Sequence, residues 1–120
     1  MKSPESATAP QNLSNATNLT AEEMAVHAEE ASQVLKSIAN PNRLMILCCL
    51  IQEEKTVGTI NNEVPLSQSA LSQHLARLRA ENLVISRKEG QTVHYRIKDP
   101  RIIELMSHLY ELYCAPEPSG

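Results

Sequence analysis

The sequence of 120 residues predicts a mainly α-helical fold with one β-hairpin, and three observations support this prediction. Apolar residues recur at helical spacing along most of the chain, whereas residues 83–98 alternate around a glycine. There is no Phe or Trp, so Leu, Ile, Val, Ala and Met must build the core, which suits packed helices. The length favours one domain. We expect that domain over residues 20–114, between a disordered tail (1–19) and a frayed end (115–120).

Capping residues indicate where the first two helices begin. Thr20 and Glu23 form a capping-box pattern, which predicts a helix over residues 21–38. Asn40 is a good cap for the next helix, and Pro41 suits its first position. That helix carries an apolar face at i, i+3, i+4 and i+7, made by Leu44, Leu47, Cys48 and Ile51. Ile46 and Leu50 widen this face, so the helix is expected to be central.

Two shorter helices follow, separated by a tight turn. Thr56 is expected to cap a helix over residues 57–63, and Ser67 a helix that runs to about Glu81. The second of them is amphipathic, with an inward apolar stripe of Leu71, Leu75 and Leu78. Two helices with this spacing are typical of a helix-turn-helix.

The C-terminal part of the domain completes the pattern. Residues 83–98 predict a two-stranded hairpin with its turn at Glu89–Gly90, placed as a wing directly after the helix-turn-helix. Asp99 and Pro100 then begin a last helix that is too apolar to lie free on a monomer. We assign it, with the first helix, to a homodimer interface. The predicted architecture is therefore a dimeric winged helix-turn-helix with the order α-α-α-α-β-β-α.

Charge is distributed unevenly along the chain. The formal net charge is −3, but residues 67–98 hold six basic and two acidic side chains, a local net of +4. A basic segment in an acidic protein is typical of a DNA-facing surface, so double-stranded DNA is the expected partner. Neither a membrane-spanning segment nor a signal peptide is apparent, and we expect a cytoplasmic protein. No catalytic or phosphate-loop motif is present, so neither an enzyme nor a cofactor is expected.

The polar faces of the predicted helix-turn-helix and wing supply the candidate DNA contacts. Gln side chains can read adenine, Ser hydroxyls bond bases or phosphates, and cations hold phosphates. The candidates on the helix are Gln68, Ser69, Ser72, Gln73, His74 and Arg77, and those on the wing are Arg87, Lys88, Gln91 and Thr92. His74 borders the apolar stripe, so a core position is an open alternative for it. For the charges on the wing, Arg96 included, a role in solubility alone is the open alternative.

Two motifs resemble a known family. Leu-Ser-Gln-Ser-Ala-Leu-Ser-Gln-His-Leu at residues 66–75 and Asn-Pro-Asn-Arg-Leu at residues 40–44 look like the ArsR/SmtB winged-helix repressors. The resemblance runs from about Ala28 to Cys114, nearly the whole expected domain. It implies a homodimeric repressor that binds operator DNA.

Within that family the chain is most similar to the sulfur-sensing branch of BigR, SqrR and HlyU. The similar segments are Ile46–Cys48, Val57–Gly58, Arg87–Glu89 and Leu112–Cys114. The branch joins one thiol from the second helix to one from the last helix through a disulfide or polysulfide, and DNA is released. The resemblance thus implies a sensor pair of Cys48 and Cys114, with reactive sulfur species as inducer. Cys49 departs from the branch pattern, and its role stays open.

Metal sensing, peroxide sensing and protein-only interaction are the alternatives. Many relatives bind metal through Cys-x-Cys on the third helix, but residues 57–63 contain no Cys. Others use Asp-x-His and a later His pair, whereas Asp99 is followed by Pro100 and Arg101. His108 and Glu111 alone make a weak site, because zinc favours four ligands. No metal ligands are therefore assigned. A module used only for protein contacts would lack salt-dependent DNA binding.

Overall fold

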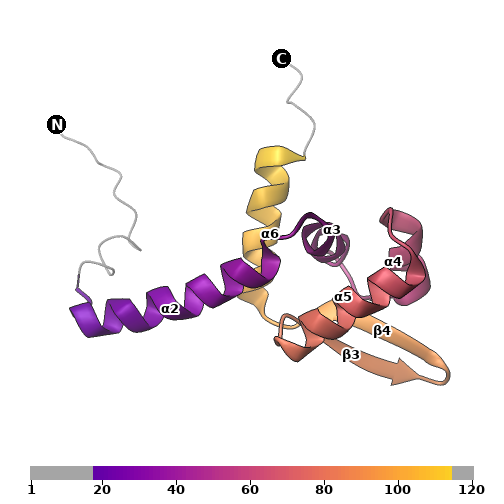
Figure 1. Cartoon of the computed structure of the whole chain (residues 1–120), viewed down its shortest axis with the longest axis horizontal. Coiled ribbons are helices and arrows are strands. Elements are labelled where there is room, and N and C mark those ends of the chain that lie inside the picture. The colour runs from indigo at the N-terminus through magenta and orange to yellow at the C-terminus, as the bar shows by residue number, and fades with distance from the viewer. Residues whose placement is uncertain (1–17, 115–120) are drawn as a thin grey trace, which may run out of the picture. The chain divides into compact units, whose positions relative to one another are not determined.

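A computed structural model describes residues 18–114, which contain five helices and three strands (Figure 1). The helices are α2 (Ala21–Ile38), α3 (Pro41–Cys49), α4 (Val57–Glu63), α5 (Gln68–Ala80) and α6 (Pro100–Tyr113). The strands are β2 (Lys55–Thr56), β3 (Val84–Glu89) and β4 (Thr92–Ile97). The chain divides into two compact units, one up to Lys36 and one from Ser37. Most of the predicted N-terminal tail (residues 1–17) and the predicted frayed end (115–120) lie outside the described residues.

The predicted helix starts are confirmed by hydrogen bonds from side chains to backbone. At α2, Glu23 N–H donates to the Thr20 hydroxyl over 3.0 Å, and Thr20 N–H donates to the Glu23 carboxylate over 2.9 Å. The other four helices begin in the same way, with side-chain oxygens of Asn40, Thr56, Ser67 and Asp99 accepting backbone N–H bonds. Local chemistry therefore fixes where each helix begins.

The core of the second unit lies where α3, α4, α5 and α6 meet. The predicted stripe of α5 is buried, with Leu71, Leu75 and Leu78 each at most 1% exposed. From α3, the residues that are fully buried are Ile46 and Leu47. Ile60 of α4 and Met106 of α6 complete this set. Helix α3 ends at Cys49, so Ile51 of the predicted apolar face lies beyond the helix and is half-buried.

The predicted hairpin is present, but the sheet has a third strand that the sequence analysis did not predict. Strands β3 and β4 pair antiparallel from Val84–Ile97 to Glu89–Thr92. The two-residue loop is therefore Gly90–Gln91, one position later than predicted, and Gly90 adopts a φ of 64° at its first position. Strand β2 adds to the other side of β4, so the order is β2-β4-β3.

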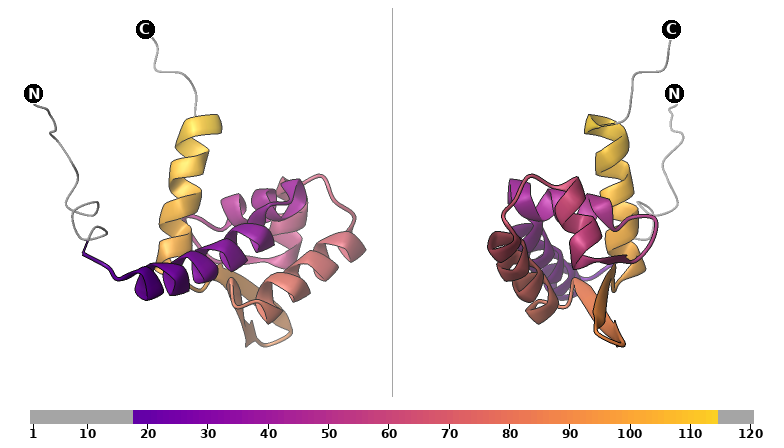
Figure 2. Two further views of the ribbon diagram at one scale, coloured as in Figure 1. Left: turned by 60° about the vertical axis from the view of Figure 1, so that its left-hand side comes forward. Right: turned by 90° about the vertical axis from the view of Figure 1, so that its right-hand side faces the viewer.

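Within this second unit, the hairpin projects from the helices at one end (Figure 2). Helix α5 packs against β3, whereas α6 packs against α3 and β4. The helix-turn-helix pair α4–α5 thus lies next to the hairpin. Helix α3 packs against α6 in a separate part of the unit. None of the helices over residues 18–114 is long and apolar enough to span a membrane.

Candidate nucleic-acid interface and thiol cavity

Helix α5 presents the polar face that the sequence predicted. With its leucine stripe turned inward, the side chains on the opposite side are exposed, namely Gln68, Ser69, Ser72, Gln73 and Arg77. His74 is half-buried beside the stripe. This burial is intermediate between the exposed DNA contact and the core residue that the sequence left open for it. An exposed run of short polar side chains on the second helix of a helix-turn-helix is suited to the major groove of DNA.

Arg77 on this face forms an ion pair with a carboxylate of the same helix end. Its Nε donates to the Glu81 carboxylate over 3.2 Å, one turn further along α5. Glu81 also accepts a hydrogen bond from the Ser37 hydroxyl. These contacts, with that from Ser37 the larger, lower the pKa of Glu81, so it is ionised and partly neutralises Arg77.

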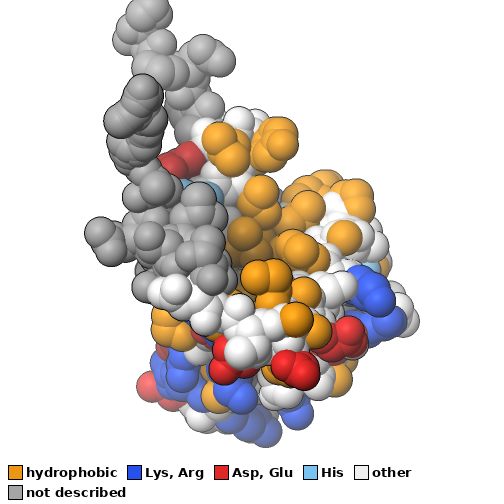
Figure 3. All heavy atoms as spheres, turned by 90° about the vertical axis from the view of Figure 1, so that its left-hand side faces the viewer, with side chains coloured by type: hydrophobic (Ala, Val, Ile, Leu, Met, Phe, Trp, Pro, Cys, Tyr) orange, Lys and Arg blue, Asp and Glu red, His pale blue; other side chains and the backbone are white. Residues whose placement is uncertain are grey.

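Basic side chains gather around the hairpin and α5. In the space-filling view of Figure 3, several Lys and Arg side chains lie along the lower edge with some Asp and Glu side chains among them, and hydrophobic side chains lie above. The exposed cations of this segment are Arg77, Arg79, Arg87, Lys88, Arg96 and Lys98. Gln91 and Thr92 are also exposed, at the hairpin tip. The charge asymmetry predicted from the sequence therefore reaches the surface as a basic region.

One of the predicted wing contacts, Arg87, is already paired with a carboxylate. Its Nε donates to both oxygens of Glu54 over 2.9 and 3.1 Å, and its Nη1 lies 3.4 Å from Glu89. The hydrogen bonds from Arg87 lower the pKa of Glu54 and raise that of Arg87 itself, so both stay ionised. His94 lies beside this group, 3.5 Å from Glu89 and 3.9 Å from Glu54. Sequence reasoning missed Glu54 and His94, since Glu54 is 33 positions from Arg87.

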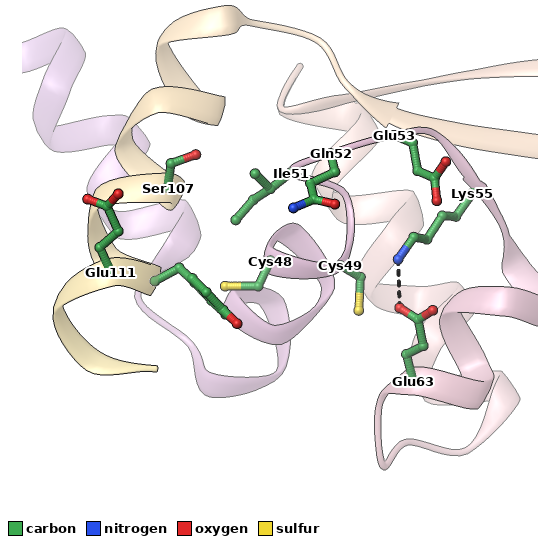
Figure 4. A pocket seen from close by; sticks show the side chains of 10 residues that line it. Cys48, Cys49, Ile51, Gln52, Glu53, Lys55, Glu63, Ser107 and Glu111 are labelled. Atoms are coloured by element: carbon green, nitrogen blue, oxygen red, sulfur yellow. Dashed lines mark hydrogen bonds and ion pairs between the residues drawn. The ribbon is translucent and has the colours of Figure 1, made fainter. Parts of the chain in front are cut away.

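The three cysteines lie in different settings. Cys48 and Cys49 are half-buried at the end of α3, whereas Cys114 is exposed at the end of α6. Burial raises the pKa of Cys48, and the charge of a nearby Cys114 raises it further. Helix α6, which Cys114 caps, packs against α3, which carries Cys48. In Figure 4 the sulfur of Cys48 points toward α6, and that of Cys49 points away from it toward Glu63.

A cavity of about 350 Å³ opens beside Cys48 and Cys49. Its lining comes from the end of α3 and the segment that follows (Ile51, Gln52, Glu53 and Lys55), from Glu63 of α4, and from Ser107, Tyr110 and Glu111 of α6. Reagents of small size therefore have a route to the α3 thiols from solvent.

Cys49 lies beside an ion pair that no sequence signal indicated. Lys55 Nζ donates to Glu63 over 2.8 Å (Figure 4). Burial first, and then a hydrogen bond with Glu63, raise the pKa of Cys49 to about 11. The thiol is consequently protonated at neutral pH. A protonated thiol is a poor nucleophile, so Cys49 is expected to react slowly in this environment.

Metal-ligating side chains do not cluster in the part of the chain that the structure describes. Across residues 18–114, no three His, Cys, Asp or Glu side chains come together as a potential metal site. His108 and Glu111 lie 3.8 Å apart on α6, as their spacing suggested, and make only a pair.

Comparisons with known proteins agree with this geometry. Residues 40–86 match the family described as bacterial regulatory protein, arsR family. The transcriptional activator HlyU of Vibrio cholerae is 45% identical over 93 residues, which cover 78% of this chain and 86% of the relative. The structure of reduced HlyU from the same organism has a TM-score of 0.74 at 45% identity, covering 78% of this chain and 99% of that one. The repressor BigR from Xylella fastidiosa has a TM-score of 0.73 at 33% identity, covering 82% and 100%.

The fold and its basic, polar face define a DNA-binding transcriptional regulator of the winged-helix class, not an enzyme. More particularly, the chain belongs to the ArsR family of bacterial regulatory proteins. The resemblance to HlyU and BigR inferred from the sequence motifs is thereby confirmed.

Proposed function

We propose that this regulator is a homodimeric repressor whose binding to operator DNA is relieved when reactive sulfur species join Cys48 and Cys114. The observation that carries the proposal is that the sulfur of Cys48, at the end of α3, points toward α6, the helix that Cys114 caps (Figure 4). A cavity open to solvent beside Cys48 supports access by a small sulfur donor.

The bridge forms by sulfur transfer from a persulfide, RSSH. In balanced form, the thiols of Cys48 and Cys114 react with three persulfide molecules to give a tetrasulfide bridge with two inserted sulfurs, three thiols (RSH) and one molecule of hydrogen sulfide. The two cysteine sulfurs are oxidised, and the sulfane sulfur released as hydrogen sulfide is reduced. Each sulfur inserted adds about 2 Å of reach to a bridge between the helices.

The DNA-binding part of the proposal assigns the exposed face of α5 to the major groove. Ser69, Ser72 and Gln73 are the candidate base readers, with Gln68 and His74 beside them. Lys88, Gln91 and Thr92 at the hairpin are exposed and available to phosphates or the minor groove. Arg77 and Arg87 join this set when DNA phosphates compete with Glu81 and Glu54 for them.

The dimer is proposed to form through the first and last helices. Exposed apolar side chains support this assignment, with Met24, Val26 and Leu35 on α2 and Tyr110, Leu112 and Tyr113 on α6. Apolar surfaces of this kind on helices are typical of subunit interfaces. A bridge from α3 to α6 would tie the DNA-reading region to this interface and change the spacing of the two α5 helices. That spacing must match half-sites about 34–36 Å apart.

The decisive experiment joins mass measurement to DNA binding. Reduced protein is treated with an organic persulfide or with peroxide, and each sample is examined by intact-mass spectrometry and by fluorescence anisotropy on promoter DNA. We expect the persulfide to add bridging sulfur atoms, less the two thiol hydrogens, and to abolish binding. Loss of binding with peroxide alone would favour a peroxide sensor. An unchanged mass, with binding altered by zinc instead, would favour a metal sensor.

A further inference from the structure

A second concave surface lies between the end of α5 and the hairpin. This basic hollow has a volume of about 340 Å³. Its lining comprises Arg79, Asn82, Val84, Ile85, Ser86 and Lys98. It therefore brings two cations, a hydroxyl and an amide to one place, and no carboxylate from residues 18–114 lines it. Such a set of donors is suited to an oxyanion.

The two cations of the basic hollow differ from the arginines that the sequence singled out. Arg77 and Arg87 are engaged by Glu81 and Glu54. Among the described residues, neither Arg79 nor Lys98 makes an ion pair, and both are exposed. A ligand that binds them displaces no carboxylate, so their positive charge is fully available.

Hydrogen bonds hold the hollow in shape. Arg79 Nη1 donates to the Ser86 hydroxyl over 3.4 Å, a long contact that leaves the other guanidinium donors unused. Asn82 takes a left-handed turn with a φ of 64°, and its N–H donates to Arg79 O over 3.0 Å. Lys98 N–H donates to Leu83 O over 3.0 Å. The backbones that carry Arg79, Asn82 and Lys98 are thus tied to one another before any ligand arrives, which reduces the ordering cost of binding.

The position of the hollow identifies the oxyanion. It lies between α5 and β3, the elements assigned to the major groove and to the wing contact. Cations beside elements that contact the grooves commonly bind the backbone phosphates and fix the register of the protein on the duplex. We propose that the basic hollow binds a backbone phosphate of the DNA through Arg79 and Lys98, with Ser86 as an additional donor. This inference rests on the operator-facing roles given above to α5 and the hairpin.

Contacts of this kind position the protein without reading bases. Each phosphate contact by a cation contributes about 0.9 to the slope of log K against log salt concentration. The site therefore predicts a specific signature. Removing the cations of the basic hollow weakens binding to operator and to unrelated duplex by a similar factor, and it makes binding less sensitive to salt.

The test uses full-length protein with Arg79→Gln, Lys98→Gln and the double substitution. Affinity is measured by fluorescence anisotropy across a salt series, on operator and on unrelated duplex. Both side chains are exposed, so the variants are expected to fold, and circular dichroism melting checks this. We expect the slope to fall by about 0.9 for each substitution. Arg79→Lys should retain most of the slope. Arg101→Gln, whose partner is Asp99, is the matched control and should leave it unchanged.

An unchanged slope in the double variant would overturn the proposal. A loss confined to operator DNA would also overturn it, because that pattern belongs to a base reader. Inorganic phosphate distinguishes a small-anion site from a DNA site. If phosphate protects wild type but not the double variant against melting while the DNA slope stays the same, the hollow binds free anions instead. A failure of the operator-facing role of α5 is recognised separately, since Gln73→Ala would then leave operator binding unchanged.

Discussion

The carboxylate of Glu54 holds the guanidinium of Arg87 through hydrogen bonds to both of its oxygens, at 2.9 and 3.1 Å from Nε. Glu54 belongs to the segment between α3 and β2, and Arg87 belongs to the hairpin. A residue assigned to DNA from its sequence position is therefore neutralised within the protein in the absence of DNA.

Releasing Arg87 is expected to strengthen DNA binding. Glu54→Gln removes the charge that competes with phosphate, so affinity should rise and the salt slope should steepen by about 0.9. Anisotropy in a salt series measures both. Glu53→Gln is the matched control, because Glu53 makes no ion pair with Arg87 in the described residues. Weaker binding by Glu54→Gln would instead show that the pair positions the hairpin.

Cys114 is expected to be required for the response but not for DNA binding. Cys114→Ser removes one thiol of the proposed bridge at an exposed position, so affinity of the reduced protein should stay nearly unchanged. The response to polysulfide should be lost, both in anisotropy and in the bridged mass. Cys49→Ser should keep both responses, since the Cys49 side chain points away from α6. A bridged product that persists in Cys114→Ser would refute the assigned pair.

Gln73 is expected to read a base. Gln73→Ala should weaken operator binding by about 1–3 kcal/mol, the contribution of one good bidentate contact. Binding to unrelated duplex should change little, because that binding depends on phosphates. Gln52→Ala, an exposed glutamine outside α5, serves as control. Equal affinity of Gln73→Ala and wild type for operator would remove Gln73 from the interface.

The thiol of Cys49 should be slow to react at neutral pH. Its pKa of about 11 lies above the ordinary 9.0, so its thiolate fraction near pH 8 is about 100-fold smaller than that of an ordinary cysteine. Alkylation by iodoacetamide, followed by peptide mass spectrometry, should therefore accelerate with rising pH until about pH 11. Glu63→Gln removes the hydrogen-bonded carboxylate and leaves Lys55 without its partner, and both changes lower the pKa.

Cys49 in Glu63→Gln should accordingly be alkylated several-fold faster than in wild type at pH 8. Glu53→Gln is the control, because Glu53 lines the same cavity and is not among the causes of the shift. If Cys49 of the native protein reacts as fast as that of the denatured protein at pH 8, the shielding is absent.

The elements predicted correctly from the sequence are those that local chemistry specifies. Asn40, Thr56 and Ser67 each bond backbone N–H groups within three residues, so their roles are visible in a short stretch of sequence. Strand β2 was missed because two residues have no periodicity, and its partner β4 lies about 40 positions further along the chain. The turn was placed one residue early because the strand register, not Gly90 alone, decides where the loop begins.

The candidate site also has features that the sequence predicts and features that it does not. The polar face of α5 follows from helical spacing, and the pairing of Cys48 with Cys114 was implied by resemblance. The environments of the side chains were not predictable. Lys55 and Glu63 are 8 positions apart in different elements, and Glu54 reaches Arg87 across 33 positions. Only folding reveals which carboxylate neutralises which cation.

The segment between α3 and α4 has a mechanical consequence. Glu53 and Lys55 line the thiol cavity. Glu54, which lies between them in the sequence, accepts hydrogen bonds from Arg87 of the hairpin. Lys55 and Thr56 pair with β4. This short stretch therefore contacts the thiol cavity, the hairpin and strand β4. A displacement of the end of α3 must either swing the hairpin with it or break the ion pair and the strand pairing. The bridge proposed at Cys48 would therefore act on the wing through a few peptide units, without involving the leucine core.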